Sequence, residues 1–146
     1  MAMLSREELR TLMEKRANPC ASLFMPTYEA GAETRQNPIR FENLLQQVWA
    51  GLEAKGYRDT EANSFLEPAR ALLNDGAFWQ HQSMGLAAFL TPEGITPFRV
   101  PLAFEELVMV GNRLHVKPLL RLLNEDGRFY ALALSQNSVR LFEGTR

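Results

Sequence analysis

Side chains that carry out nucleophilic or proton-transfer chemistry are scarce in this sequence. It has one cysteine, Cys20, and two histidines, His81 and His115. Cys20 begins the apolar stretch CASLFMPT, so we expect a buried structural thiol and not a nucleophile. We interpret His81 as a packed or surface residue and His115 as the first-turn residue of a helix. Because no catalytic triad spacing, glycine-rich phosphate loop or paired metal-binding histidines occur, we predict no catalytic residue, no metal site and no cofactor.

A polar loop with two arginines is the best candidate for a binding site. Arg35 and Arg40 flank Asn37-Pro38, which we interpret as the N-cap and the first residue of a long helix. Backbone N–H groups and the positive end of the helix dipole favour anions at such a position. We therefore predict that Arg35 and Arg40 bind an anion or RNA. In the alternative, the loop is solvated and the arginines pair with acidic neighbours, namely Glu29, Glu33 or Glu42.

The elements that must position these side chains follow from periodicity and turn residues. Ser5 and Glu8 have the spacing of a capping box, which starts a helix ending near residue 16. The strand 20–27 follows. Helices are predicted over residues 38–55 and 60–74, and Pro68 should kink or split the second. Three strands are then predicted, over residues 85–91, 95–101 and 106–111; the first two form a hairpin, and Pro97 indicates an edge strand or a bulge.

The fold class predicted from this order is α+β, a small antiparallel or mixed sheet flanked by helices. We assign residues 1–111 to this N-terminal domain. A helix over residues 115–126 and a hairpin over residues 129–146 then start a new unit, so we assign residues 112–146 to an incomplete second domain. An isolated hairpin is marginally stable in water. We therefore expect its open edges to pair with another molecule, giving a homodimer through the C-terminal hairpin.

Composition excludes several classes of protein. The formal net charge of −1 and the sequence pI of about 6.1 disfavour a strong, non-specific nucleic-acid binder. The single cysteine fits a reducing compartment. No run of eighteen apolar residues occurs, so no membrane-spanning segment is predicted. These features predict a cytoplasmic protein with no membrane partner.

Several phrases resemble a known family. HVKPLLRLLNEDGRFYALALSQNSVRLFEGTR, from His115, is similar to the start of the ribonuclease-H-like middle domain of archaeo-eukaryotic class I peptide-chain release factors and of Pelota. LSREELRTLMEKRANPCASLFMPT resembles the opening helix and first strand of their N-terminal domain. MPTYEAGAETRQNPIRFENLL and FWQHQSMGLAAFL resemble the bacterial branch, the bacterial archaeo-eukaryotic release factor-like family. The resemblance extends over essentially the whole chain.

The resemblance implies the N-terminal fragment of a ribosome-associated, release-factor-like protein acting in translation termination or rescue. Ribosome and RNA would be partners of the full-length protein. The family's stop-codon motifs are missing: AKGYRDTE, residues 54–61, stands where an Asn-Ile-Lys-Ser element would lie, and the Tyr-x-Cys-x-x-x-Phe motif is also missing. A Gly-Gly-Gln hydrolysis loop would lie beyond Arg146, so we expect no peptidyl-tRNA hydrolysis by this chain.

Two alternatives stay open. The first is a ligand- or protein-binding module that keeps the fold but no longer acts on the ribosome; the missing codon-reading motif favours it. The second is an independent hydrolase, which only the two histidines and the arginine loop support.

Overall fold

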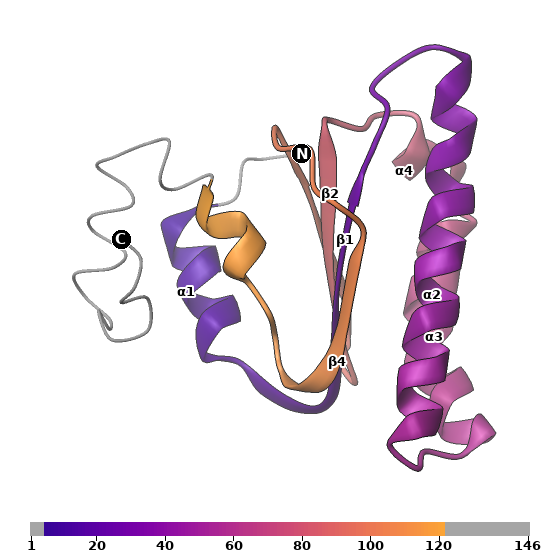
Figure 1. The fold of residues 1–146 in the computed structure, drawn as a ribbon, viewed down its shortest axis with the longest axis vertical. Coiled ribbons are helices and arrows are strands. Elements are labelled where there is room, and N and C mark those ends of the chain that lie inside the picture. The colour runs from indigo at the N-terminus through magenta and orange to yellow at the C-terminus, as the bar shows by residue number, and fades with distance from the viewer. Residues whose placement is uncertain (1–4, 122–146) are drawn as a thin grey trace.

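The fold is a small antiparallel sheet with helices on both of its faces (Figure 1). The structure is a computed structural model that describes residues 5–121. Its longer helices are α1 (Arg6–Glu14), α2 (Gln36–Ala54) and α3 (Asp59–Leu73), with a short α4 (Gly76–Trp79). Its strands are β1 (Arg16–Pro26), β2 (Gly85–Thr91), β3 (Gly94–Val100) and β4 (Leu107–Arg113). Two 3-10 turns, η1 (Ala32–Arg35) and η2 (Lys117–Leu119), complete the described elements.

The sheet has the strand order β3-β2-β1-β4, and every neighbouring pair is antiparallel. The α+β fold class predicted from the sequence is therefore confirmed. β2 and β3 form the predicted hairpin, and β3, which contains Pro97, lies at one edge of the sheet. The first strand begins at Arg16, four residues before the start predicted at residue 20. Its early part pairs with the far end of β4, across an irregularity between Arg16 and Cys20.

The capping box predicted for the first helix is present. The backbone N–H of Glu8 donates to Ser5 Oγ at 3.0 Å, and the backbone N–H of Ser5 donates to Glu8 Oε1 at 2.9 Å. Both bonds satisfy N–H groups at a helix start, which have no partner within the helix. This fixes the start of α1, which lays Leu9 and Leu12 on the sheet.

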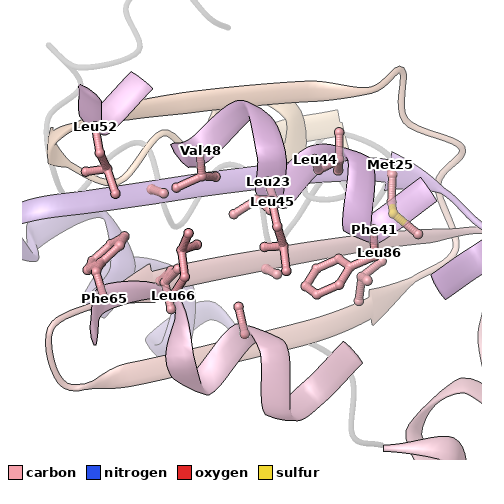
Figure 2. Close-up of a cluster of buried hydrophobic side chains, with 14 of the residues drawn as sticks. Leu23, Met25, Phe41, Leu44, Leu45, Val48, Leu52, Phe65, Leu66 and Leu86 are labelled. Atoms are coloured by element: carbon pink, nitrogen blue, oxygen red, sulfur yellow. The ribbon is translucent and has the colours of Figure 1, made fainter. Parts of the chain in front are cut away.

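The larger apolar core lies between the sheet and the α2–α3 pair (Figure 2). Side chains of β1 and β2 at alternate positions, such as Leu23 and Leu86, face the two helices because successive strand residues point to opposite faces. The side chains that α2 contributes to this core include Leu44, Leu45, Val48 and Leu52, which lie on one face of the helix.

A second core covers the opposite face of the sheet. Phe24 lies at its centre, with edge-on ring contacts to Phe89 at 5.8 Å and to Phe104 at 5.2 Å between ring centroids. Leu9 of α1 and Leu119 of η2 close this layer. The chain after β4 thus returns to the sheet, on the side of α1 (Figure 1).

The domain boundary near residue 111 stays a prediction. The residues that follow β4, Leu114 to Leu120, pack on the sheet. They begin with an irregular stretch and a 3-10 turn instead of an α-helix at His115. The rest of the predicted helix 115–126, the hairpin 129–146 and dimerisation through it lie outside the described residues.

Two helix predictions need correction. Asn37 is not the N-cap of α2, because the helix begins at Gln36 directly after η1. The side chain of Asn37 bonds the preceding loop instead of its own helix. Of the two outcomes predicted for Pro68, the split is wrong, because α3 runs unbroken from Asp59 to Leu73. Because proline has no N–H, only the carbonyl of Ser64 loses its hydrogen bond within the helix. Ser64 is exposed, so water can bond this carbonyl.

Candidate functional site

The candidate site predicted from the sequence lies where β1 ends and α2 begins, at one end of the sheet (Figure 1). Arg40, in the first turns of α2, is its central cation. Its Nε lies 3.0 Å from Glu106 Oε2, and its Nη1 donates to the carbonyl of Pro26 at 3.1 Å. Its guanidinium carbon lies 5.8 Å from the centre of the Tyr28 ring. Arg40 therefore joins α2 to the end of β1 and to the residue before β4. Its positive charge is already paired with Glu106.

Asn37 holds the loop that follows β1 against the start of α2. Its side chain is fully buried, accepts a bond from the backbone N–H of Tyr28 at 3.0 Å and donates to the Tyr28 carbonyl at 2.9 Å. The two bonds satisfy both the oxygen and the nitrogen of the amide, as burial of a polar group requires. Asn37 is thus a structural residue that fixes the position of Tyr28.

Arg35 differs from Arg40 in its surroundings. It is exposed at the end of η1, and no hydrogen bond or ion pair fixes it within residues 5–121. The N–H of Gln36 already bonds the carbonyls of η1, and Pro38 has no N–H. The start of α2 therefore offers an anion fewer free donors than the sequence predicted. Arg35 is an accessible cation here, whereas Arg40 has a structural role. Binding of an anion or RNA by the two arginines stays a prediction.

Exposed apolar side chains gather at the same end of the domain. Tyr28 is 41% exposed, Ile39 56% and Met84 44%. The backbone N–H of Thr27 donates to the carbonyl of Met84 at 2.9 Å, which places the start of β2 beside Tyr28. Tyrosine, methionine and arginine are enriched in contact surfaces between proteins, so this exposed apolar surface suits a partner.

The loop between α2 and α3 forms the opposite tip of the helical pair. Gly56 has φ +91°, a left-handed conformation that ends α2, and the backbone N–H of Arg58 donates to Glu61 Oε1 at 2.8 Å to start α3. Tyr57 ties the loop to the sheet because its hydroxyl lies 3.1 Å from Asn18 Oδ1. Lys55 and Arg58 are exposed. The tip is thus a fixed loop with two accessible cations.

The histidines and the cysteine do not form a catalytic arrangement within the described residues. The backbone N–H of His115 donates to the buried Ser22 Oγ at 2.8 Å, and its ring meets Phe24 edge-on at 6.3 Å. Burial of the ring, and secondarily the charge of Lys117, lowers the pKa of His115. His81 is exposed.

Cys20 is fully buried, and burial raises the pKa of its thiol. A thiol that keeps its proton is a poor nucleophile. The structural role expected for Cys20 is therefore the one that its surroundings support.

A shallow cleft lies between α1 and the β2–β3 hairpin, with a volume of about 380 Å³. Lys15 Nζ and Glu93 Oε1 form an ion pair 2.8 Å long at its rim, and the hydrogen bond and charge of Lys15 lower the pKa of Glu93. The floor residues Phe89 and Phe98 are almost completely buried by their neighbours. The cleft therefore offers a ligand little apolar surface.

The sequence indicates the two arginines but not the residues that define their roles. Glu106 lies 66 positions after Arg40 and Pro26 lies 14 positions before it, so neither pairing has a local signal. Asn37 precedes a proline and so marks a helix start in the sequence, but no local pattern indicates that its amide bonds the backbone of Tyr28.

Within residues 5–121, no cluster of His, Cys, Asp and Glu has metal-binding geometry, and no helix is long and apolar enough to cross a membrane. No protein-family model matches the chain, and no curated protein matches it significantly.

Proposed function

We propose that this chain is the N-terminal part of a ribosome-associated, release-factor-like protein that acts in translation termination or rescue. The observation that carries the proposal is the α2–α3 pair, which lies along one face of an antiparallel sheet and ends in an exposed loop (Figure 1). The resemblance implies this order of elements, with a leading helix, a strand, two helices and then further strands. It also implies that the loop between the two helices is the part that approaches the decoding RNA.

The chemistry of that loop supports contact with a phosphate backbone and not the reading of a codon. Lys55 and Arg58 are exposed cations at the tip, and Gly56 lets the chain turn sharply between them. The loop has no Asn-Ile-Lys-Ser element. Arginine and lysine contacts to phosphate carry no sequence information. A role in rescue, independent of the codon, therefore fits the loop better than recognition of a stop codon.

The near-neutral net charge sets the expected strength of this contact. With a formal charge of −1, the chain has no general attraction for RNA. Binding must then depend on a few local cations, so it should be weak and sensitive to salt. It should also respond strongly to the loss of individual cations.

The test is sedimentation of the chain with purified ribosomes at low salt, using two charge-reversed variants. In the first, Lys55→Glu/Arg58→Glu removes the cations of the tip. In the control, Lys117→Glu/Arg121→Glu makes the same change in net charge at exposed positions after β4, on the opposite side of the sheet.

Binding lost in the tip variant but retained in the control supports the proposal. Equal loss in both variants would show that only the overall charge matters, and the tip would then have no special role. Circular dichroism of both variants checks that the fold is intact.

The exposed apolar surface at the other end of the domain favours a second candidate, a protein-binding module. Its exposed apolar residues are Tyr28, Ile39 and Met84, and the guanidinium of Arg40 lies over the Tyr28 ring. A partner that buries this surface would be insensitive to Lys55 and Arg58. Ile39→Ser would weaken binding of such a partner and leave ribosome sedimentation unchanged, so the two functions are separable.

A further inference from the structure

The outer edge of β4 is open within the part of the chain that the structure describes. Among residues 5–121, β4 is the last strand of the sheet and pairs only with β1. Edge strands of natural proteins are usually protected by proline, charge or a bulge. β3, at the other edge, carries Pro97 and Arg99, whereas β4 reads Leu-Val-Met-Val-Gly-Asn and reaches its first charge only at Arg113.

We propose that a second copy of this chain pairs with this edge, β4 against β4 in antiparallel orientation, so that the two sheets become one. The two-fold axis passes through Met109. A closed, isologous contact of this kind uses the same strand of both copies and leaves no new open edge at the junction.

The two faces of β4 restrict the possible registers. Val108 and Val110 face α2, with Val110 packed beside Gly51, whereas Met109 is on the other face and 45% exposed. In a continuous antiparallel sheet, residues directly opposite each other point to the same face. A symmetric pairing therefore sets odd-numbered residues of β4 against odd-numbered residues of the second copy.

An axis at Met109 gives a register in which the opposed side chains are complementary. Glu105 then lies opposite Arg113 of the second copy, and this pair occurs twice. Both residues are exposed, and neither has an ion pair within residues 5–121. Opposite charges directly across an antiparallel pair are stabilising.

Shape supports the same register. Leu107 lies opposite Gly111 of the second copy, and the position of a side chain on Gly111 is open space, with no atom within 4 Å. Leu107 is only half-buried within its own chain. The leucine of each copy would thus fill the space beside the glycine of the other, and the two Met109 side chains would cover each other.

Other registers lose this complementarity. Moving the axis to Val110 sets Arg113 against Leu107, so the Glu105 of each copy has no arginine or lysine opposite it. Pairing Arg113 with Glu106 is excluded because Glu106 lies on the α2 face, where it binds Arg40. Charge, shape and the alternation of faces therefore agree on Met109.

Disulfide trapping tests this register directly in the full chain. A residue on the two-fold axis has its own copy opposite, at a Cα separation of about 4.5–5.5 Å in an antiparallel pair, which suits a disulfide. Met109→Cys should therefore form a covalent dimer under mild oxidation. The matched control is Asn112→Cys, also on β4 and exposed. Its two copies would be six residues out of register, about 20 Å apart, so it should stay monomeric.

A charge exchange tests the same contact without oxidation. Glu105→Arg and Arg113→Glu should each raise the dimer dissociation constant by about three- to thirtyfold, measured by analytical ultracentrifugation, because each places like charges opposite each other twice. The double variant Glu105→Arg/Arg113→Glu should restore the original constant. A chain that is monomeric at every accessible concentration would overturn the proposal. Equal cross-linking at positions 109 and 112, or no recovery in the double variant, would also overturn it.

Discussion

Arg40 and Glu106 form an ion pair 3.0 Å long that joins the first turns of α2 to the residue before β4. The Arg40 side chain is 24% exposed and also donates to the Pro26 carbonyl, so three separate segments meet at one guanidinium. Arg40→Ala breaks both contacts and leaves Glu106 without its cation. We expect the free energy of unfolding to fall by about 1–2 kcal/mol. Arg35→Ala should change it by less than about 0.5 kcal/mol, since Arg35 is exposed.

Urea denaturation of the two alanine variants measures this difference. If both change the midpoint equally, Arg40 is no more structural than Arg35, and the division of roles between the two arginines is wrong.

Asn37 should be among the most sensitive polar positions of the protein. Its amide is fully buried and bonds both backbone groups of Tyr28. Asn37→Ala leaves these two backbone groups without partners, and we expect a loss of about 2–4 kcal/mol in the free energy of unfolding. Asn43→Ala, at an exposed position of the same helix, is the control and should be nearly neutral. A small effect at position 37 would mean that water replaces the amide.

The sequence predicted the elements that have strong local signals. The Ser5–Glu8 capping box, the apolar period of α2 and the β2–β3 hairpin were all recognisable because residues within a few positions of each other determine them. The start of α2 was predicted less well. Asn37 before a proline suits an N-cap, but the buried position of its side chain depends on a loop that returns from β1.

Long-range pairings could not be predicted at all. Glu106 and Arg40 come together because β4 lies next to β1 in the sheet, and local patterns do not give the strand order. The same holds for Ser22 and His115, which are 93 positions apart. Arg40 was therefore identified as a candidate anion-binding residue, while its structural role became apparent only in three dimensions.

The core prediction concerns Leu45, which is 5% exposed between α2 and the sheet (Figure 2). Leu45→Ala removes apolar contacts and leaves a cavity, so the free energy of unfolding should fall by about 2–5 kcal/mol. The adjacent exposed residue serves as the control, and Gln46→Ala should be nearly neutral. An unchanged chemical-denaturation midpoint for Leu45→Ala would place this side chain outside the core.

His115 should make stability depend on pH in a known direction. Burial of its ring, and secondarily Lys117, lowers its pKa in the folded state. The unfolded chain therefore binds a proton more readily, and stability is lost as the pH falls below the unfolded pKa of about 6.5 and towards the lower folded pKa. Above pH values of about 6.5, His115 is neutral in both states and makes no pH-dependent contribution to stability.

The measurement compares His115→Asn with the original protein in urea denaturation at about pH 7.5 and about pH 5. The original protein should lose more free energy of unfolding on acidification than the variant does. His81→Asn, at an exposed position, should behave like the original protein. Equal losses in the original protein and His115→Asn would show that His115 titrates alike in both states.

The central claim is that the chain contacts the ribosome through a few local cations. The measurement that tests it most directly is the equilibrium affinity of the full chain for purified ribosomes across a series of salt concentrations. We predict saturable binding at low salt. The logarithm of the association constant should fall linearly with the logarithm of the salt concentration. The slope should be small, about one to two, as expected for two phosphate contacts. A folded chain that shows no saturable binding at the lowest salt concentration would contradict the account.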